Sequence, residues 1–504
     1  METASTAGAT DTTTRTRNLL AVNSPAPLSL PERLRQLARE RSDADAVTLA
    51  DTTLSRAELV GQANALAAHL QSLGVQPGDY VSIVLPNCVE CVVATFATWF
   101  VGGIPQPLSP KLSTNELHEI LKLTQPAAVI GYEMPGGPVT VGTDFTALPS
   151  AGDLPDAVSP AWKAPTSGGS TGRPKVIVAN QPAVYDSVSG FAGLFGLDET
   201  STALITAPMS HNGPFMVAHL TILAGGHAVL MPRFDAEEAL RLIQAHRVTW
   251  VYAVPTMMGR IVKLPDDVRA SYDVSSIAVW MHMAAPCPPA VKEHFIEWLG
   301  PQVIRELYAG TEAQAGTLLD GNEWLTHRGS VGRVMIGEIE IRDDSGAALS
   351  TGEVGHVWMR RGPDAPTPYY YLGAEATVAS DGWESLGDVG WMDADGYLYL
   401  GDRDSDMILV GGSNVYPAEV EAALLEHPSV EDACVIGLPD DDLGSAPHAL
   451  VKLSADVDDD EFREFLRDRL APYKQPRSIE RVDHVLRDDA GKIRRSALRA
   501  ERLT

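Results

Sequence analysis

Short apolar runs alternate with helical patterns along most of this chain of 504 residues, and that alternation restricts the fold more than any other feature. The clearest runs are Tyr80–Leu85, Ala203–Ala207, Ala228–Met231 and Trp250–Val254. Strands that are apolar on both faces are typical of parallel sheets that helices cover on each side. The alternation therefore predicts an α/β fold with buried, largely parallel strands.

Two predicted helices begin at clear capping residues. Ser29 precedes Leu30-Pro31-Glu32, so that a capping hydroxyl, an early proline and an acidic first turn follow in the favoured order. Ser55-Arg56-Ala57-Glu58 is a capping box, and Gly74 predicts the end of the helix that it starts. Residues 1–25 are rich in Ser, Thr and Ala and lack the apolar region of a signal peptide, so we expect a disordered leader there.

A chain of this length predicts at least one smaller unit beside a large domain, because a single hydrophobic core stops growing below this size. Asp393-Ala394-Asp395-Gly396 is typical of a hairpin turn, and the charged stretch Arg403–Asp406 is typical of a linker. We therefore predict an N-terminal domain over residues 26–402 and a small α+β domain over residues 403–504, with a hinge at about 403–406. The predicted elements of the smaller domain are the helices Ala418–Leu425 and Asp460–Leu470 and the strand Ala433–Ile436.

The charge of the chain restricts its partners. Asp and Glu together number 66 against 39 for Lys and Arg, which gives a formal net charge of −27. Such a surface repels nucleic acids and anionic membranes. The longest apolar stretch, about Cys91 to Ile104, is shorter than the ~20 residues that span a bilayer, so we expect no stable membrane insertion. A nucleotide would have to be held by local backbone N–H groups and a few placed cations.

The four cysteines are too few and too scattered for a disulfide framework, which fits a reducing cytoplasm. Cys88 and Cys91 form a C-x-x-C pair, but no second pair or nearby histidine completes a zinc site. The segment Cys91–Phe100 has the pattern of an apolar helix instead. We therefore expect no metal or redox role for these thiols.

A glycine- and hydroxyl-rich segment is the strongest local signal of function. It comprises Thr166, Ser167, Gly168, Gly169, Ser170, Thr171 and Gly172, and continues as Arg173, Pro174 and Lys175. Successive N–H groups of such a loop can point inward and hold phosphate oxygens, and Lys175 adds positive charge. A flexible linker would not need the ending Arg-Pro-Lys before an apolar run, and the order of a Walker A loop fails because Pro174 precedes the lysine. The segment predicts a phosphate-binding loop.

A second motif, Tyr308-Ala309-Gly310-Thr311-Glu312, follows this loop in the sequence. Together the two motifs resemble the AMP-forming acyl- and aryl-CoA synthetase, adenylation-domain and luciferase superfamily. The resemblance implies a large N-terminal domain with mixed and parallel sheets and helices, and a small mobile α+β C-terminal domain. It also implies that Tyr308 stacks on adenine, with Ala309 and Gly310 beside it, that Thr311 contacts the α-phosphate and that Glu312 holds Mg²⁺.

Three later residues match the family's motifs in order. By resemblance, Asp388 accepts both ribose hydroxyls of ATP, and Arg403 joins it there. Lys492, in Gly491-Lys492-Ile493-Arg494, resembles the mobile lysine that bridges the acid's carboxylate and the α-phosphate. Its expected work is electrostatic, because charge builds on the phosphate oxygens as the carboxylate attacks. The expected catalytic residues are therefore Lys175, Thr311, Glu312 and Lys492.

The resemblance also points to an acid-binding pocket. Three segments would line it, and the residues expected there are His211, Asn212, Gly213, Met281, Ala284 and Ala285. His211 would orient the acid, although a histidine satisfied within the core is an alternative. Apolar groups such as Met281 and Phe215 would suit an aromatic or alicyclic acid, and the sequence does not identify it.

The second half-reaction needs a nucleophile for the acyl adenylate. Gly411–Glu419 resembles the segment that the small domain presents to the pantetheine tunnel after rotation, which implies coenzyme A as co-substrate, with ATP and Mg²⁺ as the other requirements. We expect a cytoplasmic, ATP-dependent, AMP-forming acid–thiol ligase that works by domain alternation, and leave a homodimer open. The alternatives are transfer to a carrier-protein thiol or an amine, activation of an inorganic acid such as nitrite, a phosphate-hydrolysing NTPase, and a regulator with decayed chemistry.

Overall fold

The computed structural model describes most of the chain between residues 27 and 503. The described ranges are 27–133, 137–168, 174–363, 365–401, 406–410, 413–440, 443–488 and 491–503. The expected leader, residues 1–25, lies outside them. No helix within these ranges has both the length and the apolar character that crossing a membrane requires.

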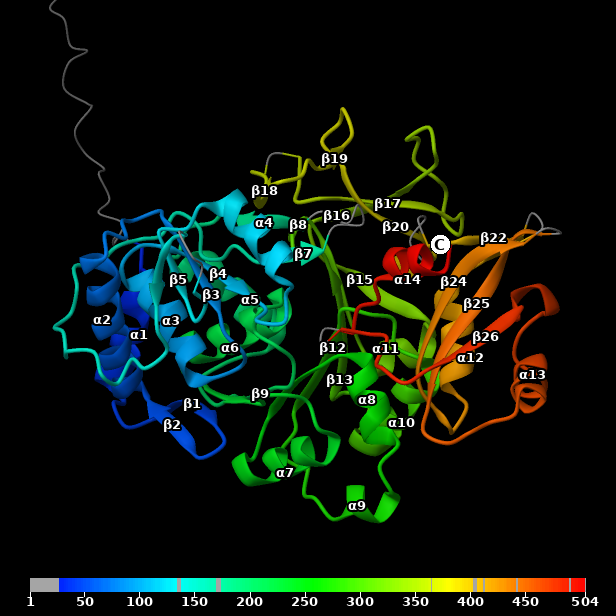
Figure 1. Cartoon of the computed structure of the whole chain (residues 1–504), viewed down its shortest axis with the longest axis horizontal. Coiled ribbons are helices and arrows are strands. Elements are labelled where there is room, and N and C mark those ends of the chain that lie inside the picture. Colours follow the sequence, from blue (N-terminus) through cyan, green and yellow to red (C-terminus); the bar gives the residue numbers. More distant parts are fainter. Residues whose placement is uncertain are drawn as a thin grey trace, which may run out of the picture.

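A large mixed sheet forms the centre of the molecule (Figure 1). Its parallel part consists of six strands among the described residues, with one antiparallel strand at the edge. In spatial order these strands are β2 (Thr52–Ser55), β1 (Asp45–Leu49), β10 (His227–Leu230), β9 (Thr202–Ile205), β11 (Trp250–Ala253), β12 (Val279–Met283) and β13 (Ile304–Ala309). The expected α/β class with largely parallel strands is confirmed for this part.

The same sheet continues with antiparallel strands beyond β13. In spatial order they are β14 (Gly316–Asp320), β15 (Ser330–Ile336), β21 (Tyr397–Leu400), β20 (Glu384–Met392), β17 (Gly355–Arg360) and β16 (Glu338–Arg342), with β19 (Thr377–Val378) paired to β20. The predicted turn at Asp393-Ala394-Asp395-Gly396 joins β20 to β21, and the Asp393 N–H donates to the Tyr397 carbonyl over 3.0 Å. The mixed sheet expected from the family resemblance is therefore present.

Helices cover both faces of the parallel part because successive side chains of each strand point to opposite faces. Ala203, Ile205 and Tyr252 belong to one buried cluster, whereas Leu204 and Val251 belong to another. Helices on the first face are α1 (Leu30–Glu40), α2 (Arg56–Ser72), α3 (Val89–Phe100), α5 (Tyr185–Phe195) and α6 (Asn212–Ala224). Helices on the second face are α7 (Ala236–His246), α8 (Pro255–Val262), α10 (Pro289–Leu299) and α11 (Gly321–Thr326), with α9 (Asp266–Ala270) beside α7.

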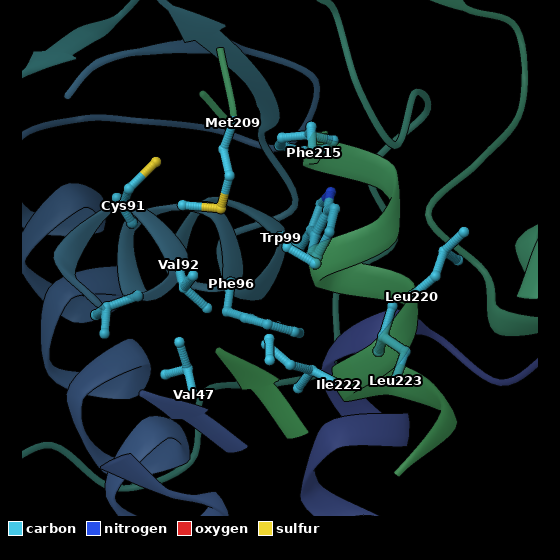
Figure 2. Close-up of a cluster of buried hydrophobic side chains, with 14 of the residues drawn as sticks. Val47, Cys91, Val92, Phe96, Trp99, Met209, Phe215, Leu220, Ile222 and Leu223 are labelled. Carbon is cyan, nitrogen blue, oxygen red and sulfur yellow. The ribbon is translucent and has the colours of Figure 1, made fainter. Parts of the chain in front are cut away.

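The helices α3 and α6 pack against each other in the centre of the first cluster (Figure 2). Trp99 and Phe215 are fully buried between them, and the Trp99 indole N–H donates to the Trp162 carbonyl over 2.9 Å. Cys91 lies in α3 and Cys88 is its N-cap, as the apolar-helix interpretation of this segment expects. Burial raises the pKa of the Cys88 thiol to about 12 and also raises the pKa of Cys91, so both stay protonated at neutral pH.

Two smaller sheets flank the large one. The first is parallel and has the order β4 (Ile104–Leu108), β3 (Tyr80–Val84), β5 (Ala128–Ile130) and β6 (Val139–Val141), with α4 (Thr114–Thr124) packed nearby. The second is antiparallel and has the order β18 (Tyr369–Leu372), β8 (Pro174–Ala179) and β7 (Thr166–Gly168). This second sheet matters for function because the predicted phosphate-binding loop joins β7 to β8.

The C-terminal residues have a hydrophobic cluster of their own, which extends from Ile408 to Leu470. Its strands are β22 (Ile408–Val410), β23 (Ser413–Val415), β24 (Val430–Asp440), β25 (Gly444–Leu453) and β26 (Ser478–Val482). Its helices are α12 (Pro417–Leu425), α13 (Asp459–Arg467), the 3₁₀ turn Pro472–Lys474 and α14 (Arg495–Arg502). These elements, orange to red in Figure 1, make the small α+β unit that was expected. The boundary at residue 403 remains a prediction because 402–405 lie outside the described residues.

Most sequence expectations for single elements are confirmed. Ser29 caps α1, and Ser55 and Glu58 form the complete capping box of α2. The four predicted strands are β3, β9, β10 and β11, each of which ends one or two residues early. The expected helix end at Leu470 is wrong, because α13 stops at Arg467 and Pro472 then starts a 3₁₀ turn.

Candidate active site

The carboxyl ends of four neighbouring parallel strands meet at one edge of the large sheet, and the candidate residues follow them. The segment with His211 follows β9, Val254 follows β11, Ala284 follows β12, and Gly310 begins the turn after β13. Parallel sheets bind their ligands at this edge, because the loops that leave the strands converge there. The fold therefore gathers three motifs that lie far apart in the sequence.

Asn87 holds the loop after β9 and the end of the neighbouring strand β10 in place. Its amide donates to the carbonyls of Ala207 and Met231 over 3.0 and 2.9 Å, and its oxygen accepts from the Met209 N–H over 2.7 Å. Asn87 is buried, so these hydrogen bonds form away from water. Met209 in turn packs near α3, as Figure 2 shows, which positions the residues that precede His211.

Lys175 and Glu312 form an ion pair at this edge. Lys175 Nζ lies 3.1 Å from Glu312 Oε1 and donates to the Tyr371 hydroxyl over 3.0 Å. The Tyr371 hydroxyl donates to the same Glu312 oxygen over 2.5 Å. Glu312 is only 5% exposed, so this carboxylate is shielded from water. Mg²⁺ prefers carboxylate oxygens, and Glu312 beside a phosphate-attracting lysine is therefore a donor set that fits the expected ion.

Tyr308 and Asp388 form a second pair, although three strands of the sheet separate β13 from β20. The Tyr308 hydroxyl, at the end of β13, donates to Asp388 Oδ2 over 2.7 Å. Asp388 lies in β20 directly after Gly387, whose φ of +84° favours glycine. Both side chains are half-buried, so they remain accessible. The residues expected to contact adenine and ribose thus lie together, 80 residues apart in the sequence.

The turn after β13 is held by a network behind it. The Gln314 amide donates to Glu384 Oε2 over 2.9 Å, and the Tyr369 hydroxyl donates to the same oxygen over 2.6 Å. A Cβ at Gly310 would lie 2.5 Å from Leu386 Cδ1 and 3.0 Å from Glu312 Oε2, so any side chain there would have to displace the end of Leu386 and crowd the Glu312 carboxylate. Thr311 is half-buried between Gly310 and Glu312, and Ala309 is exposed.

The residues expected in the acid pocket come from two parts of the structure, the start of α6 and the end of β12. His211 is the N-cap of α6, and Asn212 and Gly213 are its first residues, all half-buried. Met281 is fully buried in the main cluster, whereas Ala284 is exposed with a φ of +77° and Ala285 is half-buried. A Cβ at Gly213 would lie 2.9 Å from the Tyr252 hydroxyl and 3.2 Å from Met283 Sδ, so α6 and β12 approach each other closely here. A role for all six in binding an acid stays a prediction.

The segment with Lys492 is a tight turn with firm anchors. The Asp488 N–H donates to the Lys492 carbonyl over 2.8 Å, and the Lys492 N–H donates to Asp488 Oδ1 over 2.9 Å. On either side of the turn, Arg487 and Arg495 donate to the two carboxylate oxygens of buried Glu421 over 2.9 and 2.7 Å. One carboxylate in α12 thus fixes the base of the Lys492 turn.

This turn docks on the large domain at the same sheet edge. A Cβ at Gly491 would lie 3.4 Å from Val254 Cγ2, next to the end of β11. Arg494 forms an ion pair with Glu116 in α4 at 2.8 Å. Lys263, after α8, donates to the Val430 carbonyl at the start of β24. The C-terminal unit is therefore placed with the Lys492 turn next to the converging strand ends.

Part of the predicted site lies outside the described residues. Gly169, Ser170, Thr171, Gly172 and Arg403 belong to this group, and the side chain of Ser167 is also not described. The flanking backbone is described: Thr166 pairs with Val176, and Gly168 pairs with Pro174. The predicted phosphate-binding loop thus connects the two strands of a β-hairpin, β7 and β8, and Lys175 is the second residue of β8.

Sequence reasoning missed two residues of the site. Tyr371 was absent from the prediction, although the run Tyr369-Tyr370-Tyr371 in a strand sends the first and third rings to the same face. Lys163 was also missed, and its ammonium group donates to Asn212 Oδ1 over 2.5 Å. No local pattern marks a buried lysine, because lysines are usually exposed.

The model of the AMP-binding enzyme family matches residues 34–371, and that of the AMP-binding enzyme C-terminal domain matches residues 419–492. The chain belongs to this family. The two matches contain Lys175, Glu312 and Lys492, which the geometry brings to one edge of the sheet. The family resemblance inferred from the motifs is confirmed.

Individual relatives narrow the class of enzyme. The 2-succinylbenzoate–CoA ligase of Bacillus licheniformis is 31% identical over 93% of this chain and 99% of its own length. A feruloyl-CoA synthase from an Amycolatopsis species is 32% identical, over 92% of this chain and 96% of its own. The solved o-succinylbenzoate CoA synthetase of Bacillus subtilis, in complex with its acyl-adenylate intermediate, has a TM-score of 0.79 and 28% identity, over 92% of this chain and 97% of its own. The expected fold and the expected class, an AMP-forming acid–thiol ligase, are confirmed.

Proposed function

We propose that this enzyme converts a small aromatic or alicyclic carboxylic acid to its acyl adenylate with release of pyrophosphate, and then transfers the acyl group to coenzyme A. One observation supports the first step above all others. The Lys492 turn of the C-terminal unit lies against Val254, at the edge of the sheet that also carries the Lys175–Glu312 pair. From this turn, Lys492 would supply a second ammonium group to the site from another part of the chain.

Each residue would contribute a defined interaction to the first step. ATP would be bound with Asp388 accepting from the ribose and Tyr308 beside it, and Mg²⁺ at Glu312 would neutralise phosphate charge. Lys175 would hold phosphate oxygens opposite Glu312. Lys492 would stabilise the charge that develops at the attacked phosphorus, which is worth most in a site that water does not reach.

The second step would require the C-terminal unit to turn. One of its contacts with the large domain among the described residues is the ion pair of Arg494 with Glu116, whose side chains are 64% and 37% exposed. Exposed ion pairs of this kind contribute little free energy, so the docked position can be left without a large barrier. Rotation would withdraw Lys492 and bring the segment Gly411–Glu419 toward the acyl adenylate, as domain alternation requires.

The surroundings of α6 support a flat or cyclic acid. Gly213 lies against the Tyr252 ring and Met283, and both are apolar surfaces that suit a ring. The relatives named for 2-succinylbenzoate and for a feruloyl thioester also take ring-bearing acids. We propose the cytoplasm as the location, because the four cysteines are free thiols.

The test of this function is ATP–pyrophosphate exchange with the purified chain against a panel of aromatic, alicyclic and short aliphatic acids. Exchange that depends on a ring-bearing acid and Mg²⁺, with AMP and not ADP as the product, is the expected result. Release of ADP would refute adenylation. Product analysis with coenzyme A, an amine or a carrier protein as acceptor then identifies the second step, and an amide product would replace the thioester proposal.

Asp388→Ala is expected to raise the KM for ATP, because the ribose hydroxyls lose their hydrogen-bond acceptor. The loss of that acceptor costs roughly 1–3 kcal/mol of binding free energy. The measurement is exchange as a function of ATP concentration at a saturating concentration of the acid. Asp483→Ala is the matched control, since that carboxylate is fully exposed and, within the described part of the chain, pairs with its neighbour His484. An unchanged KM for ATP in Asp388→Ala would remove this residue from the nucleotide site.

A further inference from the structure

Lys163 is a buried lysine whose ammonium group has one hydrogen bond among the described residues, and that bond points toward the expected acid site. Lys163 is 5% exposed. It lies just before β7, in the segment that runs beside β8. Its ammonium group donates to Asn212 Oδ1 over 2.5 Å and lies 5.1 Å from the centroid of the Trp162 ring. Within the described residues no carboxylate lies at ion-pair distance from it, and Glu312 acts on it only at longer range.

A buried ammonium without a contacting carboxylate destabilises a fold unless other groups compensate its charge. Burial lowers the pKa of Lys163 to about 7, and the charge of Glu312 opposes that shift. An anionic or strongly accepting group placed near this ammonium would stabilise it. Among the described residues, the Asn212 amide oxygen is the one acceptor at contact distance.

The contact with Lys163 determines which way the Asn212 amide is turned. An ammonium group can only donate, so Asn212 must present its oxygen to Lys163 and its NH₂ group away from it. Asn212 is half-buried whereas Lys163 is buried, which leaves the NH₂ group on the accessible side. The preceding Ser210 also has a buried hydroxyl with no hydrogen-bond partner among the described residues.

We propose that Lys163 is a positioning residue for substrate selection: it holds the Asn212 amide as a hydrogen-bond donor toward the acid. The enzyme then prefers carboxylic acids that carry a second hydrogen-bond acceptor, which is a hydroxyl, a keto oxygen or another carboxylate. A site built to donate a hydrogen bond discriminates strongly against the analogue that lacks the acceptor. This inference rests on the proposed function, because it places the acid at the start of α6.

The test compares Lys163→Met and Asn212→Ala with the unaltered full chain. Benzoate and its hydroxy-, acetyl- and carboxy-substituted forms serve as matched acids, and kcat/KM is measured by ATP–pyrophosphate exchange. We expect the unaltered enzyme to prefer one acceptor-bearing form over benzoate by about 10- to 100-fold. Both variants should bring this ratio close to one. The double variant should lose no more of the preference than either single variant. The KM for ATP should stay unchanged in all of them, which a general structural defect would not allow.

Lys122→Met is the control, because that lysine is exposed in α4, and it should keep the preference. If Lys163→Met fails to fold, the half-buried Asn212→Ala variant decides the question alone. The inference is overturned if both variants still prefer the acceptor-bearing acid. It is also overturned if the unaltered enzyme catalyses exchange but shows no such preference. Either outcome leaves the proposed function intact. Lack of exchange with every acid of this series and of the wider panel overturns both.

Discussion

Lys492→Ala is expected to slow adenylate formation by about 100- to 1,000-fold, while thioester formation from a supplied acyl adenylate continues. The size follows from the loss of one charge-stabilising donor in a preorganised site, ~2.7–4 kcal/mol. The second step is spared because Lys492 belongs to the turn that faces the site only in the docked arrangement, with Gly491 against Val254. Pyrophosphate exchange reports the first step, and coenzyme A consumption with synthetic acyl adenylate reports the second.

The matched control for this experiment is Lys452→Ala. That lysine also lies in the C-terminal unit, where it pairs with Glu431 at 2.8 Å on the surface. It should leave both steps within about twofold, because exposed pairs contribute little. An equal loss of both steps in Lys492→Ala would contradict domain alternation and place the lysine in a role common to both half-reactions.

Lys292→Met is expected to lower the free energy of unfolding by about 3–5 kcal/mol, because it leaves a buried carboxylate without its cation. Lys292 in α10 donates to Glu306 in β13, and the two side chains are 3% and 7% exposed. His282 Nδ1 lies 3.9 Å from the other Glu306 oxygen, but burial and the charge of Lys292 keep the pKa of His282 well below its ordinary value. In the unaltered protein His282 is therefore neutral, and Lys292 is the cation that compensates Glu306. Urea unfolding followed by tryptophan fluorescence measures the effect.

The double variant Lys292→Met/Glu306→Gln tests the cause of that loss. It removes both charges and keeps the shape, so it should recover most of the stability. Lys122→Met, which breaks the exposed pair with Glu119, should change the unfolding free energy by no more than about 1 kcal/mol. If the single and the double variant lose the same amount, packing around Trp324 and not the uncompensated charge is responsible.

Much of the parallel part of the fold could be predicted because its signals are local. The strand β11 is a short apolar run, and the start of α2 is fixed by Ser55 and Glu58 within one turn. The antiparallel part carried weaker signals. In β20 buried and half-buried residues mix without regular alternation, since this strand pairs on both sides and also carries Asp388. The pairing of strands that lie far apart in the sequence cannot be inferred from any short stretch of residues.

The candidate site shows the same division. The motif around Tyr308 and the order of the later residues indicated the nucleotide site, and the structure brings Tyr308 to Asp388 and Lys175 to Glu312. Sequence patterns could not indicate that Tyr371 joins the Lys175–Glu312 pair, because that contact depends on β18 pairing with β8.

By itself, the sequence determined the chemistry: which side chains are present, in what order, and which helices and strands can form around them. Capping, apolar periodicity and glycine-rich turns act between residues a few positions apart, so they can be inferred from short stretches. Only the tertiary structure decided that Lys163 lies buried against Asn212 and that the Lys492 turn rests on Val254. Those placements depend on many weak contacts between distant segments, whose sum exists only once the sheets and helices have packed.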